Sequence, residues 1–96
     1  MKAIFISFDQ AHKDDVIRIL DKHLIRGYTL WEGTQGRGTV SGEPHYGSHA
    51  WPSLNNSILT IIDESKVDNL KESLKELDAE SPKLGLKIFM WAAEVL

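Results

Sequence analysis

The chain has 96 residues, the size of one small domain, and its content of 42% hydrophobic and 26% charged residues is ordinary for a globular protein. The absence of cysteine excludes disulfides, thiolate metal sites and a cysteine nucleophile. A formal net charge of -3 argues against nucleic-acid binding, and no apolar run is long enough to insert into a membrane. We therefore expect a single cytoplasmic domain over residues 1–96.

The first third of the chain predicts a strand, a helix and a second strand. Residues 2–8 are rich in β-branched and aromatic side chains, which favour a strand. Asp14 and Asp15 precede a helical pattern, where carboxylates stabilise a helix start, and Gly27 suits the left-handed position after the helix. Residues 28–32 predict the second strand. The apolar residues at helical spacing are Val16, Ile17, Leu20 and Leu24.

The second half repeats this order. Residues 57–62 predict a strand, residues 64–77 a helix with one apolar stripe, and residues 86–93 a last strand after Ser81 and Pro82. The order β-α-β-β-α-β predicts an α+β, ferredoxin-like fold, in which two helices cover one face of a four-stranded antiparallel sheet.

The predicted strands are apolar on both faces, although two helices can cover only one face. Two apolar sets alternate along the first, third and last strands. One set is Ile4, Ile6, Phe8, Ile58, Ile62, Ile88 and Met90, and the other is Ala3, Phe5, Leu59, Ile61, Phe89 and Trp91. An uncovered face of this kind is a larger apolar patch than soluble monomers normally expose. We expect a second copy of the same chain to cover it.

Residues 33–55 show no periodicity and contain five of the seven glycines and two of the three prolines. Loops of this length in small domains are usually functional or disordered. We expect a long flexible loop that becomes ordered on a ligand or a partner.

Two kinds of contact residue occur in this loop. Glu43, His45 and His49 offer carboxylate and imidazole ligands for a divalent metal, or they contact a partner. Tyr46 and Trp51 are aromatic anchors suited to a partner protein. The other histidines, His12 and His23, belong to the first helix, and the sequence suggests no partner for either.

Signals for catalysis are weak, because there is no nucleophile elbow and no acid–base pair stands out from the surface charges. We therefore expect a protein that is not an enzyme. Two fragments suit an anion instead: the glycine-rich run 33–38 with Arg37, and Lys87 after the run 83–86.

Several segments resemble the PII signal-transduction family. Residues 1–4 and 12–20 look like its first strand and its Lys-Leu-Asp-Glu-Val helix, and residues 27–32 match its Gly-x-Thr-Val-x-Glu strand. Gly36-Arg37 looks like the Gly-Arg of its Gly-Phe-Gly-Arg-Gln segment, and Tyr46-Gly47 and Trp51-Pro52 fall where its T-loop ends. Residues 85–89 resemble its Gly-Asp-Gly-Lys-Ile-Phe segment.

The resemblance implies a homotrimer whose sheet faces pack together, with a T-loop-like insertion between the second and third strands that docks on a partner protein. It also implies an adenine nucleotide between subunits, held by Gly36, Arg37, Gly38, Gly85 and Lys87. Gly38 replaces a family glutamine and the phosphate loop is shortened to residues 81–86, so we expect weak nucleotide binding. The implied function is a non-catalytic regulatory or sensor protein.

Two alternatives remain. A trimeric metal-binding protein similar to the CutA family would use the loop histidines. A small ferredoxin-like enzyme, such as a cofactor-free monooxygenase dimer, would need a convergent polar set on the strands, which the sequence does not suggest.

Overall fold

Four strands and two α-helices account for most of the residues that the computed structural model describes, which are 1–35 and 54–96. Two short 3₁₀ turns, η1 and η2, lead from a strand into a helix within this part of the chain. The order confirms the predicted βαββαβ fold. The elements are β1 (Lys2–Asp9), η1 (Gln10–His12), α1 (Lys13–Lys22), β2 (Tyr28–Thr34), β3 (Asn55–Ile62), η2 (Glu64–Lys66), α2 (Val67–Glu80) and β4 (Lys87–Ala92).

The strands form an antiparallel sheet with the spatial order β2-β3-β1-β4. β1 lies inside the sheet, where each of its residues pairs with β3 and residues 2–7 also pair with β4. Phe5 of β1 is therefore opposite Leu59 on one side and Phe89 on the other. Side chains at paired positions point to the same face, so this register decides which residues meet there.

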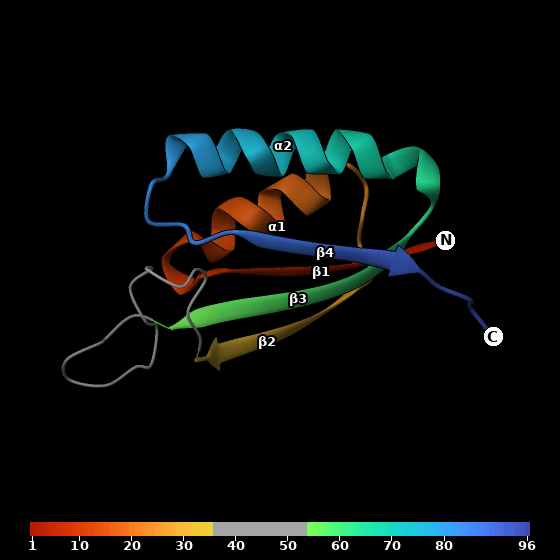
Figure 1. Cartoon of the computed structure of the whole chain (residues 1–96), viewed down its shortest axis with the longest axis horizontal. Coiled ribbons are helices and arrows are strands. Elements are labelled where there is room, and N and C mark those ends of the chain that lie inside the picture. The colour runs from red at the N-terminus through yellow and green to blue at the C-terminus, as the bar shows by residue number, and fades with distance from the viewer. Residues whose placement is uncertain (36–53) are drawn as a thin grey trace.

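α1 and α2 cover one face of the sheet, and the opposite face is left open (Figure 1). The core lies between the helices and the covered face. Every second residue of β1 points into it, and the helices contribute residues spaced one turn apart, as an amphipathic helix does. The buried core residues are Ile4, Ile6, Phe8, Val16, Leu20, Ile25, Ile58, Ile62, Val67, Leu70, Leu74 and Leu84.

The open face is apolar over β1, β3 and β4, as the strand sequences predict. Ile61 is 38% exposed, Phe89 56% and Trp91 48%. Trp31 of β2 lies near Phe5 of β1, with ring centroids 6.5 Å apart. The helices bury one set of strand side chains, and Ile61, Phe89 and Trp91 of the alternate set stay accessible on the single chain.

The end of α1 differs from the expectation that Gly27 takes the left-handed position. α1 ends at Lys22, and Leu24 has φ 59° instead. The amide of Leu24 donates to the Asp21 carbonyl at 3.0 Å and that of Ile25 to the Leu20 carbonyl at 2.9 Å, the two bonds of a Schellman motif. Burial of Ile25 in the core holds this turn, so the chain leaves the helix three residues earlier than Gly27 suggests.

Other boundaries shift by one to three residues. The segment predicted as a helix over 64–77 begins with η2, and α2 runs on to Glu80. β2 continues to Thr34 and β3 begins at Asn55, so both ends of the predicted loop 33–55 are strand. Among the described residues, no helix is both long enough and apolar enough to cross a membrane.

Candidate functional site

A polar row crosses the open face at the end of the sheet nearest to Thr34. Trp31 of β2 pairs with Ser57 of β3, Ser57 pairs with Ser7 of β1, and Ser7 pairs with Lys87 of β4. Antiparallel pairing places these side chains side by side on one face. The row therefore joins an aromatic ring, two hydroxyl groups and an ammonium group at the border of the apolar open face.

Hydroxyl groups at the β2–β3 end of this row are already engaged. The Thr34 hydroxyl donates to the Asn55 carbonyl at 2.8 Å and lies 3.4 Å from the Ser57 hydroxyl. The Gly33 amide donates to the Asn56 side-chain oxygen at 3.3 Å, and Gly33 has φ 71°. These bonds hold β2 and β3 together where their register shifts between Trp31 and Thr34.

Lys87 begins β4, directly after the loop 81–86. Among the described residues, no carboxylate lies within ion-pair distance of its ammonium group. Leu84 anchors the preceding loop in the core, and its carbonyl accepts from the Asp9 amide at 2.7 Å. Gly85 then takes φ 60°, a left-handed conformation that suits glycine. The loop thus sets Lys87 at the start of an edge strand with its charge available to an anion.

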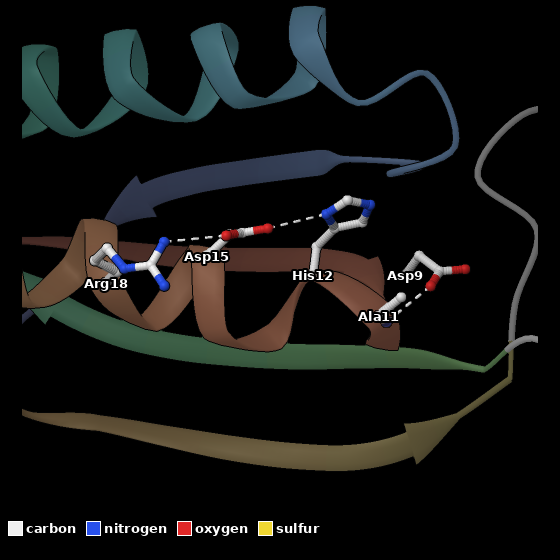
Figure 2. Close-up of polar contacts among 5 residues, drawn as sticks. All are labelled: Asp9, Ala11, His12, Asp15 and Arg18. Atoms are coloured by element: carbon white, nitrogen blue, oxygen red, sulfur yellow. Dashed lines mark hydrogen bonds and ion pairs between the residues drawn. The ribbon is translucent and has the colours of Figure 1, made fainter.

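A polar cluster lies at the start of α1, where Figure 2 shows His12 of η1 with Asp15 and Arg18 of α1. The His12 Nδ1 atom is 3.1 Å from one Asp15 oxygen, and Arg18 donates to the other at 3.2 Å. The His12 hydrogen bond, assisted by the Arg18 guanidinium, lowers the pKa of the Asp15 carboxyl below its ordinary value. Spacing of three residues puts these groups on one helix face, and they stabilise the start of α1.

No family model matches the chain, and no curated protein matches it. Solved structures do match. The nitrogen regulatory PII-like protein CPII from Thiomonas intermedia K12, bound to ADP, AMP and bicarbonate, has a TM-score of 0.75 at 20% identity, covering 94% of this chain and 82% of that chain. The fold is that of the PII-like proteins.

Two further structures agree with this PII-like fold. The apo form of CPII has a TM-score of 0.68 at 19% identity, covering 94% of this chain and 87% of that chain. A candidate PII-like signalling protein from Thermus thermophilus has a TM-score of 0.66 at 20% identity, covering 94% and 83% of the two chains. The resemblance noted from the sequence is therefore confirmed at the level of the fold.

Most of the predicted site residues of this chain lie outside the described residues. Of the predicted nucleotide-binding set, the structure places Gly85 and Lys87. The predicted residues outside the described part are Gly36, Arg37 and Gly38 for the nucleotide, Glu43, His45 and His49 for a metal, and Tyr46 and Trp51 for a partner. Within residues 1–35 and 54–96, no three histidine, aspartate or glutamate side chains gather to hold a metal ion.

Sequence reasoning missed the hydroxyl groups beside Lys87 and the partners of two histidines. Ser7 interrupts the apolar alternation of β1 on the open face, which is the signal that would have found it. His12 pairs with Asp15, as described above. His23 Nε2 lies 2.8 Å from the Ser73 hydroxyl, so His23 links the end of α1 to α2. No local pattern indicates a pair that is fifty residues apart.

Proposed function

We propose that this chain is a PII-like regulatory protein without catalytic activity, which assembles through its open sheet face and binds a small effector near Lys87. The observation that carries the proposal is the juxtaposition of an accessible apolar face with an ammonium group at its border. Regulatory proteins with this fold are the structural neighbours reported above.

Self-association follows from the exposed aromatic side chains of the open face. Phe89 and Trp91 are about half exposed on the single chain, and burying such rings stabilises an interface. Three copies around one axis would give each open face a neighbour, which is the homotrimer implied by the PII resemblance. Such an assembly would place the edge residue Lys87 close to a subunit boundary.

The proposed effector is an adenine nucleotide, bound weakly. CPII was crystallised with ADP, AMP and bicarbonate, which supports an anionic effector for a chain of this fold. Here Lys87 would hold a phosphate group, and Gly85 would let the backbone approach it. Gly36, Arg37 and Gly38 would complete the site, as the PII resemblance implies.

The proposed regulatory target is a partner protein, which binds residues 33–55 through Tyr46 and Trp51. The sequence supports this because aromatic residues within a glycine-rich connection are suited to anchor a protein interface. The proposal predicts that Trp51→Ala abolishes capture of the partner while nucleotide binding persists.

Calorimetric titration with ADP and AMP tests the effector site. Lys87→Ala should weaken binding of either nucleotide about tenfold or more, because a charge-assisted hydrogen bond is lost. Lys75→Ala is the matched control, since it removes the same charge from the exposed side of α2. Equal affinities of wild type, Lys87→Ala and Lys75→Ala would overturn the assignment of the site. If neither nucleotide binds the wild type, the proposal of an adenine nucleotide as effector is overturned.

A further inference from the structure

The same capping turn occurs twice in the described structure, at the end of β1 and at the end of β3. Asp9 accepts a hydrogen bond from the Ala11 amide at 2.9 Å, and Asp63 accepts one from the Ser65 amide at 2.9 Å. The backbone angles also agree, with φ -61° and ψ 135° at Asp9 and φ -67° and ψ 144° at Asp63. Each aspartate caps a 3₁₀ turn that leads into a helix.

The surroundings of the two turns differ. The carboxylate end of Asp63 is exposed, whereas Asp9 is only 8% exposed. Around Asp63 the backbone bond stays local, from the Lys66 amide to the Asp63 carbonyl at 3.0 Å. The Asp9 turn instead makes two bonds to distant segments. The Asp9 amide donates to the Leu84 carbonyl at 2.7 Å, and the Gln10 amide donates to the Leu54 carbonyl at 2.9 Å.

We propose that the Asp9–Gln10 turn couples the loop 81–86 to the chain at Leu54. Two consecutive amides hold the two segments, and the capping bond from Ala11 to Asp9 sets the backbone angles between those amides. A displacement of the Leu84 carbonyl must therefore be transmitted to Leu54, or one of the two bonds must break. Because Asp9 is buried, an unsatisfied Asp9 amide is costly, so Asp9 should follow Leu84 and carry the adjacent Gln10 amide with it.

This coupling would connect the two functional parts of the chain. The loop 81–86 leads into Lys87, and Leu54 belongs to the 33–55 connection. The regulatory use of the turn rests on the proposed function, because it assumes an effector near Lys87 and an output from that connection. The coupling itself does not depend on either and is tested without any effector.

The test perturbs one segment and observes the other by two-dimensional NMR. Gly85→Ala strains the loop, because alanine is disfavoured at φ 60°. We expect this substitution to shift the amide resonances of Leu54 and Asn55 and to increase hydrogen exchange at the Gln10 amide. Gly27→Ala is the matched control, since Gly27 has no positive φ and an added Cβ would have no atom within 4 Å.

A second substitution removes the connection itself. Gln10→Pro deletes the amide that donates to Leu54, and proline is tolerated at the first position of a helical turn after an extended residue. In the Gln10→Pro background, Gly85→Ala should no longer shift Leu54, whereas Asn55 still faces Asp9 in the β1–β3 pairing and reports on the sheet. Glu64→Pro is the matched control at the first residue of η2, and the shifts should persist there. Asp9→Ala, which removes the capping carboxylate and keeps the Gln10 amide, should weaken the response of Leu54.

The outcomes decide the proposal. No response of Leu54, Asn55 and Gln10 to Gly85→Ala overturns the coupling, and this holds even if Gln10→Pro fails to fold. A response of Leu54 that survives in both Gln10→Pro and Asp9→Ala places the connection elsewhere and also overturns the coupling. Failure of ADP to bind in the calorimetric test leaves these NMR results unchanged, so the two proposals fail separately.

Discussion

Ser7 of β1 lies directly opposite Lys87 of β4, on the open face and at the border of its apolar part. A hydroxyl group next to an ammonium group offers a second hydrogen bond to an oxyanion. Ser7→Ala should therefore weaken ADP binding about three- to tenfold, the loss expected for one hydrogen bond. Calorimetry measures the change, and Ser65→Ala on η2 is the control, with an unchanged affinity. An affinity of Ser7→Ala equal to that of the wild type would remove Ser7 from the site.

Assembly through the open face predicts the effect of a charge placed on it. Sedimentation equilibrium of the wild type should give about three times the chain mass of 10.8 kDa. Phe89→Glu should give single chains with the secondary structure intact, because Phe89 is 56% exposed and outside the core. Ala79→Glu adds the same charge on the exposed side of α2 and should leave the assembly unchanged. A wild type that sediments as single chains at micromolar concentration contradicts this prediction.

The Asp15 cluster predicts a pH dependence of stability. The pKa of Asp15 is lowered below 3.8, first by the His12 hydrogen bond, so its ionised form stabilises the folded chain above that pH. This contribution is lost as the pH falls through the lowered pKa. Asp15→Asn should reduce the free energy of unfolding at neutral pH by at most about 1 kcal/mol, since the Asp15 side chain is 40% exposed and solvent screens its interactions.

Thermal unfolding over a pH series measures this difference. The gap in Tm between wild type and Asp15→Asn should close as the pH falls below 3.8, because the wild-type carboxyl becomes protonated. Asp14→Asn is the control for loss of a carboxylate in the first turn of α1. A gap that is the same size at acid and neutral pH would mean that ionisation of Asp15 does not stabilise the fold.

The left-handed conformation of Leu24 predicts a stabilising substitution. Leucine is disfavoured at φ 59°, and its side chain is 65% exposed, so little packing is lost on replacement. Asparagine tolerates this conformation better, and Leu24→Asn should raise the free energy of unfolding by about 0.5–1 kcal/mol. Urea denaturation measures it. Arg26→Asn, at an exposed position without a positive φ, should stay within about 0.5 kcal/mol of the wild type. A lower free energy of unfolding for Leu24→Asn than for the wild type would contradict backbone strain at Leu24.

The sequence determined the elements and the character of both sheet faces. Apolar residues at alternate positions of residues 2–8 and at every third or fourth position of residues 67–77 report local geometry, because side-chain direction follows from the backbone period. The same alternation places Phe89 and Trp91 on the face of the sheet that points away from the core. The resemblance of residues 85–89 to the PII family also predicted Gly85 and Lys87 as site residues, and this stays a prediction.

Tertiary structure decided which of these residues meet. Ser7 and Ser57 join Lys87 only through the pairing of β1 with both β3 and β4, and strand register depends on contacts between distant segments. α1 ends at Lys22, five residues before Gly27, because Ile25 is buried in the core and the Schellman bonds hold Leu24 in the left-handed region. The bonds from Asp9 to Leu84 and from Gln10 to Leu54 likewise span most of the chain. Local periodicity carries no information on such pairs, since they form only when the core brings their segments together.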